Sequence, residues 1–168
     1  MTLFEIINTI NTIALYQPNI NTIIKTGDVF DLNKDNFTKK YSAFCCTQNQ
    51  HTEEGDYITY NFTLFYIDRL TDDYRNKTEI QSVGITTLHN IIQMLKDIEV
   101  LDSNTTITYQ PFTERFEAEC AGVYCTVGIT TPIDVCADYY QERIVEILGD
   151  FNFDYTETDF FVKKNITV

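Results

Sequence analysis

One segment, residues 57–68 (YITYNFTLFYID), constrains the fold more than any other part of the chain. Its even-numbered positions form a continuous apolar face: Ile58, Tyr60, Phe62, Leu64 and Tyr66. The intervening positions begin polar at Thr59 and become apolar at Phe65 and Ile67. Alternation with a period of two is typical of a β-strand with one buried face. The pattern therefore predicts a strand that begins half-solvated and ends covered on both faces.

Two helices are predicted from apolar repeats of about 3.6 residues. Thr2 and Glu5 form a capping box that opens the first helix, and Pro18 ends it because proline disfavours helical geometry in the preceding residue. The second helix has Asn76 as its N-cap and Glu79 at the third position, and it runs for about six turns. Gly84 interrupts this helix, and close approach of another backbone is one reason to tolerate a glycine there.

The other segments predict shorter elements joined by turns. Residues 19–40 are interpreted as a connector with a turn at 26–28 and one short strand, and residues 48–55 as a polar turn. Further strands are expected at residues 41–47, 105–109, 112–120 and 122–131, with Ala121 and Gly122 supplying a turn or bulge. The predicted fold class is α+β, tail-terminator-like, with a mainly antiparallel sheet packed against an N-terminal helix and a long central helix.

A chain of 168 residues is long enough for one sizeable core. We assign residues 1–136 to the main domain and residues 137–168 to a C-terminal extension. Residues 137–149 fit a short helix or a strand equally well. The aromatic tail from Phe151 onward is either an arm that docks onto a neighbouring molecule or a strand that returns to the chain's own sheet.

The charge of the chain limits its partners. Twenty-five acidic and twelve basic residues give a formal net charge of -13, so a phosphate backbone or an anionic bilayer is repelled by the average surface. Sequence-specific binding of nucleic acid is disfavoured, whereas an acidic channel would let DNA slide without sticking. We find no apolar stretch of membrane-spanning length and no secretory signal, and we expect the protein to mature in the cytoplasm of the cell that makes it.

Residues suited to catalysis or metal binding are present without a recognisable motif. Five cysteines and two histidines, His51 and His89, would allow a thiol nucleophile with a base, but no local signature supports one. The cysteine spacing matches no zinc site, and no glycine-rich nucleotide fingerprint occurs. Asp68, Asp72 and Asp73 suggest a divalent cation, although an ion pair of Asp68 with Arg69 is the simpler interpretation. We predict no cofactor and no metal.

The order of elements resembles the tail-terminator and head-to-tail connector fold of tailed phages. Residues 61–92 (NFTLFYIDRLTDDYRNKTEIQSVGITTLHNII), 27–33 (GDVFDLN) and 108–123 (TYQPFTERFEAECAGV) resemble tail-neck ring proteins of crAss-like Bacteroides phages. The resemblance implies a non-enzymatic virion protein, assembled in the host cytoplasm into a twelvefold or sixfold ring. Such a ring would join the portal to neighbouring tail and neck proteins and surround a DNA channel. Within that interpretation, we expect lateral subunit contacts at Asp68, Arg69, Asp72, Asp73, Asn76, Glu79 and Gln81.

Two alternatives belong to other functional classes. The first is a cytoplasmic phage adaptor or host-takeover factor that binds one partner through its acidic surface. The second is a small thiol enzyme that uses one of its cysteines.

Overall fold

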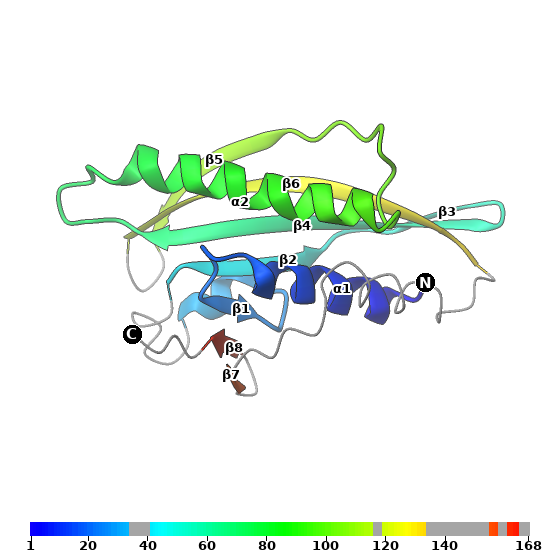
Figure 1. Ribbon diagram of the computed structural model, residues 1–168, viewed down its shortest axis with the longest axis horizontal. Helices are drawn as coiled ribbons and strands as arrows, with labels where there is room; N and C mark the ends of the chain where they lie inside the picture. The colour runs from blue at the N-terminus through cyan, green and yellow to red at the C-terminus, as the bar shows by residue number, and fades with distance from the viewer. Residues whose placement is uncertain (34–40, 116–118, 134–154, 158–160, 165–168) are drawn as a thin grey trace.

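The computed structural model describes residues 1–33, 41–115, 119–133, 155–157 and 161–164, and these residues form an α+β fold (Figure 1). This confirms the α+β class predicted from the sequence, with a mainly antiparallel sheet, an N-terminal helix and a long central helix. In chain order, the elements are α1 (Leu3–Tyr16), β1 (Thr22–Ile24), the 3-10 helix η1 (Val29–Asn33), β2 (Ala43–Gln48), β3 (Thr52–Glu54), β4 (Tyr57–Arg69), α2 (Lys77–Asp97), β5 (Tyr109–Arg115), β6 (Glu119–Pro132), β7 (Tyr155–Glu157) and β8 (Phe161–Lys164).

Within the described residues, the strands form one sheet in the order β5-β6-β4-β2-β1-β8-β7, and β3 pairs with β4. The longest ladder joins β4 to β6 in antiparallel register, from Tyr57 opposite Pro132 to Arg69 opposite Cys120. β1 and β2 are parallel, and β8 pairs antiparallel with β1. Of the two interpretations of the aromatic tail, residues 161–164 therefore follow the one in which a strand returns to the chain's own sheet, whereas residues 137–149 lie outside the described residues.

The main core lies between the sheet and the two helices, which run along the length of β4 (Figure 1). The alternating pattern of β4 is confirmed, because Phe62, Leu64 and Tyr66 are buried against residues of both helices. From α1, Ile6, Ile10 and Ile13 enter this core. From α2, the core receives Ile80, Leu88, Ile91, Ile92 and Leu95. Burying each such side chain stabilises the fold by about 1.5–3 kcal/mol.

The opposite face of the sheet carries a smaller cluster at the C-terminal end of β4. Ile67 is fully buried there together with Ile24, Ala43, Cys45 and Cys120. The strand is therefore covered on both faces at this end, as the sequence predicts. Towards its N-terminal end the same face carries Thr59, Asn61 and Thr63, which are all partly exposed.

The first helix begins and ends where the sequence predicts. Glu5 N–H donates to Thr2 Oγ1 over 3.3 Å, and Thr2 N–H donates to Glu5 Oε2 over 2.6 Å, which completes the capping box. The helix ends at Tyr16, and Gln17 takes an extended conformation before Pro18.

Replacing Thr2 with alanine should lower the free energy of unfolding by about 1 kcal/mol, because the first turn of α1 loses its side-chain acceptor. Urea titration followed by circular dichroism measures this loss. Asn8→Ala is the matched control, since Asn8 is exposed on the same helix and alanine has the higher helix propensity. An equal loss in both variants would contradict a role for the cap.

Several predicted boundaries are wrong for identifiable reasons. Residues 52–54, interpreted as part of a polar turn, form β3, whose side chains are all exposed and so leave no apolar alternation to detect. Of residues 105–109, only Tyr109 belongs to a strand. Ala121 and Gly122 form no turn but lie within β6, where Gly122 faces Ile67.

Two features of α2 also differ from expectation. The helix begins after Asn76, but the Asn76 side chain makes no capping hydrogen bond. Gly84 allows a close approach by a side chain and not by a backbone, since a Cβ there would lie 2.8 Å from Cδ1 of Tyr66.

Candidate functional site

The site predicted from the sequence lies at the corner where β4 ends and α2 begins. Leu70 N–H still bonds the carbonyl of Glu119, and the chain then turns through residues 71–76 into the helix. Tyr74 lies in this turn with a φ of 57°, a conformation that costs energy for most residues with a side chain. We call residues 68–81 the corner.

The Asn76 side chain braces the corner instead of capping the helix. Its Nδ2 donates to the carbonyl of Arg69 over 3.1 Å. Its Oδ1 accepts from the backbone N–H of Thr71 at 2.9 Å and from the Thr71 hydroxyl at 3.1 Å. One amide thus ties the end of the strand to the start of the helix, which explains why an N-cap residue leaves the helix uncapped.

Asp73 holds the turn from within. It accepts a hydrogen bond from Thr71 Oγ1 over 2.8 Å and one from the Arg75 backbone N–H over 3.3 Å. These two bonds, the Thr71 hydroxyl first, lower the pKa of Asp73. The Arg75 Nε also lies 2.9 Å from Asp73 Oδ2 on the exposed surface. The corner is therefore ordered before it meets any partner.

A polar hollow of about 420 Å³ opens beside the corner. Its lining comes from the end of β4, the start of α2 and the segments around α1 and β2: Pro18, Asn19, Asn21, Ser42, Tyr66, Asp68, Asn76, Glu79, Ile80 and Val83. Burial raises the pKa of Tyr66 to about 12, and the neighbouring Asp68 charge adds to the effect. Sequence reasoning did not identify Asn19, Asn21 or Ser42, because they lie far from residue 68 along the chain.

Asp68 is a partly buried carboxylate that lines this hollow. Burial raises its pKa, and the hydrogen bond from the Arg69 N–H, over 2.7 Å, only partly offsets that effect. A carboxylate held in this way reduces stability at neutral pH, since its charged form is better solvated in the unfolded chain.

The structure brings together only some of the seven predicted interface residues. Asp68, Asn76 and Glu79 line the polar hollow, whereas Arg69 and Asp72 line a second hollow of about 360 Å³. Asp73 lies inside the turn, and Gln81 is half-buried on α2 and lines neither hollow. Asp68 makes no ion pair with Arg69 in the described part of the chain, because neighbouring strand residues point to opposite faces. The assignment of all seven residues as subunit contacts stays a prediction.

The described cysteines are placed as packing residues. Cys45 and Cys46 point to opposite faces of the sheet, and each belongs to a different apolar cluster. Burial raises the pKa of Cys45 to about 12, of Cys125 to about 12 and of Cys120 to about 11, and it also raises that of Cys46. Cys136 lies outside the described residues.

Both histidines make polar contacts with groups other than the cysteines. His51 Nδ1 accepts the backbone N–H of Asn61 over 3.2 Å, and His89 Nδ1 lies 3.4 Å from the Tyr109 hydroxyl. Among the residues that the structure describes, no group of three or more histidine, cysteine or carboxylate side chains could hold a metal ion.

Replacing Asp68 with asparagine should stabilise the protein at pH 7. Between the ordinary aspartate pKa, about 3.9, and the raised value, the folded state binds more protons than the unfolded state, so stability falls as pH rises. Asparagine can still accept the Arg69 bond but carries no charge. Thermal unfolding between pH 3 and pH 7 should show that the stability advantage of the variant over the parent increases as pH rises.

Asp73→Asn is the matched control, because its pKa shift has the opposite sign. Stability from Asp73 is present above the unfolded pKa and is lost as pH falls through the lower folded value. This variant should therefore be less stable than the parent at pH 7, and the difference in stability should become smaller in acid. Parallel pH profiles for the two variants would contradict the assigned environments.

Comparison with known proteins adds no relative: no protein-family model matches the chain, and no curated protein matches it. Among the described residues, neither helix is long and apolar enough to cross a bilayer.

Proposed function

We propose that this chain is a structural virion protein that forms a homo-oligomeric ring in a phage neck or tail. The ring joins the portal to neighbouring tail proteins and surrounds the channel through which DNA passes. The observation that carries the proposal is the braced corner: two of the residues expected to make lateral contacts, Asp72 and Asp73, lie on an exposed turn that is held by its own hydrogen bonds.

A pre-organised surface favours assembly for a physical reason. Association costs free energy for every side chain and loop that must be ordered on contact. At the corner the backbone is already fixed by Asn76 and Asp73, while Asp72, Tyr74 and Arg75 remain exposed. Copies of the chain would therefore meet a rigid surface and lose little freedom there.

The charge and the thiols fit a structural role better than a catalytic one. A net charge of -13 keeps DNA from adhering to the average surface, so the polymer can move through a ring without sticking. The raised pKa values of Cys45, Cys120 and Cys125 disfavour the thiolate that a cysteine nucleophile requires.

Light scattering of the purified protein, alone and with portal complex, tests the proposal. We expect a discrete large oligomer, either in solution or when the portal surface is supplied, with twelvefold or sixfold symmetry in electron micrographs. Mass spectrometry of purified particles should find the chain in many copies. Monomer under both conditions together with absence from particles would overturn the proposal and favour an adaptor or host-takeover role.

A further inference from the structure

The polar hollow beside the corner is lined by charges of one sign. Of the described residues that line it, Asp68 and Glu79 are carboxylates, and none is a lysine, arginine or histidine. Arg69 follows Asp68 at the end of β4, so its side chain points to the opposite face of the sheet, where it lines the second hollow. Arg69 therefore does not neutralise the hollow.

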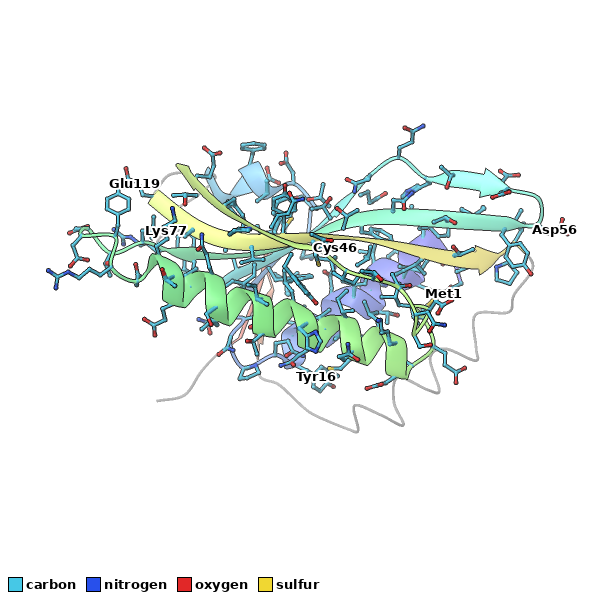
Figure 2. The ribbon with its side chains drawn as sticks, turned by 90° about the horizontal axis from the view of Figure 1, so that it is seen from above. Met1, Tyr16, Cys46, Asp56, Lys77 and Glu119 are labelled. Carbon is cyan, nitrogen blue, oxygen red and sulfur yellow. The ribbon has the colours of Figure 1, made fainter. Side chains whose placement is uncertain are left out.

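Lys77 does not supply the missing charge either. It precedes Glu79 by two positions in α2, and residues two apart on a helix do not face each other. Figure 2 shows Lys77 at the start of the helix, towards one end of the long axis of the molecule. Its side chain is exposed and does not line the hollow. The described lining thus carries negative charge with no cation to balance it.

The hydrogen-bond donors of the hollow are largely used within the protein. Asn19 Nδ2 donates to Thr87 Oγ1 over 3.3 Å, and Asn21 Nδ2 donates to the carbonyl of Tyr41 over 3.1 Å. The Ser42 hydroxyl donates to the carbonyl of Asn19. In the described part of the chain, neither asparagine amide oxygen accepts a hydrogen bond. Both oxygens therefore remain available to a ligand that donates.

Asp68 adds a carboxylate oxygen to this set. Its Oδ1 accepts the Arg69 N–H over 2.7 Å, and no described group donates to its Oδ2. Tyr66 and Ser42, with 2% and 5% of their surfaces exposed, are in hydrogen-bond contact with each other in the same lining. A partly buried carboxylate without a cation costs stability, and a cationic ligand would offset that cost. The hollow is therefore suited to a ligand that carries positive charge and donates hydrogen bonds.

The remaining lining distinguishes between kinds of cation. Pro18, Ile80 and Val83 supply apolar surface, which a metal ion does not use. Calcium takes about six to eight oxygen ligands, and among the described residues no group of three or more histidine, cysteine or carboxylate side chains could hold a metal ion. The space of about 420 Å³ is instead of the size that small organic ligands occupy.

The geometry of Asp68 also favours an ammonium over a guanidinium group. A guanidinium pairs best with both oxygens of a carboxylate, and one oxygen of Asp68 already accepts a backbone bond. An ammonium is a compact charge that needs only single oxygens around it. An aliphatic stem attached to it would lie along the apolar surface of Ile80 and Val83, as lysine stems do.

We propose that the polar hollow binds an aliphatic primary ammonium group, with its charge at Asp68 Oδ2 and its carbon chain against Ile80 and Val83. The two asparagine amide oxygens accept its other hydrogen bonds, and the exposed Glu79 adds negative potential beside the hollow. A free aliphatic amine and a lysine side chain of a partner protein both present this group. The inference goes beyond the proposed ring and does not depend on it.

Methyl NMR of the full chain, titrated with butylamine hydrochloride at pH 7, tests the proposal. The method works on single chains and on large oligomers. The methyl signals of Ile80 and Val83 should shift and saturate, whereas that of Ile129, which does not line the hollow, should stay in place. Tetramethylammonium chloride has the same charge without N–H groups, and butanol has the same chain without the charge. Neither should produce saturable shifts.

Asp68→Asn separates binding from folding, because this variant should be more stable than the parent. It should weaken butylammonium binding about tenfold or more, since the charged acceptor is lost. Glu79→Gln should weaken binding only about two- to threefold, because an exposed charge is screened by solvent. Asp72→Asn makes the same charge change at an exposed position outside the lining and should bind as the parent does.

Two further ligands distinguish the sources of the ammonium group. Cadaverine, whose second ammonium could reach Glu79, should bind more tightly than butylamine if the hollow takes a free amine. N-acetyl-lysine methylamide should bind more tightly than butylamine if the hollow takes a lysine of a partner. Equal shifts with tetramethylammonium, or unchanged affinity in Asp68→Asn, would overturn the inference. Either result leaves the ring proposal standing, because light scattering tests that separately.

Discussion

Replacing Gly122 with alanine should destabilise the protein by about 3 kcal/mol or more, the upper range for overpacking a core. Gly122 lies in β6 opposite Ile67, where the added Cβ would collide with the carbonyl oxygen of Tyr66. It would also lie 2.7 Å from Cζ of the Phe112 ring. The carbonyl belongs to a strand paired along its whole length. Moving it would therefore break strand pairing, and moving the Phe112 ring would lose its packing contacts.

Gly128→Ala is the control for this prediction. Gly128 is on the same strand and the same face, but a Cβ there would meet Asn61 Oδ1 at 2.9 Å and Thr59 Cγ2 at 3.3 Å. Both atoms end rotatable side chains, so we expect a change within about 1 kcal/mol. Urea denaturation of both variants measures the difference, and equal losses would show that steric contact at Gly122 is not the cause.

Replacing Phe62 with alanine should cost about 3–5 kcal/mol, because it deletes a fully buried ring at the centre of the main core. The cavity would lie between the sheet and both helices, where the surrounding elements are too constrained to collapse. Chemical denaturation followed by circular dichroism gives the loss. The variant should also bind a dye specific for exposed apolar surface if its native state becomes loosely packed.

Phe65→Ala compares the two faces of the same strand. Phe65 is half-buried on the opposite face, with its ring centre 6.0 Å from that of Phe112 and 5.5 Å from that of Tyr124. Losing these contacts should cost about 1–2 kcal/mol. A larger loss at Phe65 than at Phe62 would reverse the assignment of the core to the helical face.

The long periodic segments could be predicted from the sequence. α1, α2 and β4 each repeat an apolar position often enough for one face to dominate, and in α1 the capping box also marks the start of the helix. β3 could not be found in this way, because its three exposed residues owe their strand geometry to pairing with β4. Gly122 was misread as a turn because small residues mark both turns and close packing, and only the neighbouring strand distinguishes the two.

The candidate site was predicted only in part for a related reason. The run from Asp68 to Glu79 is local, so its position between a strand and a helix follows from the pattern. The Asn19 and Ser42 side of the hollow comes from segments that meet β4 only after folding. The role of Asn76 also depended on geometry, since an asparagine before a helix caps it in most cases and here bonds Thr71 and Arg69 instead.

The pairing of β1 with β8 has a consequence for synthesis. β1 emerges from the ribosome well before its partner, because Ile24 and the Phe161 that it pairs with are 137 positions apart in the sequence. At ordinary translation rates of about 5–20 residues per second, that edge of β1 waits roughly 7–30 seconds for its partner. Thr22, Ile23 and Ile24 are all buried once the sheet is complete. Until then they form an edge strand with unpaired backbone N–H and carbonyl groups, through which nascent chains of one polysome can aggregate.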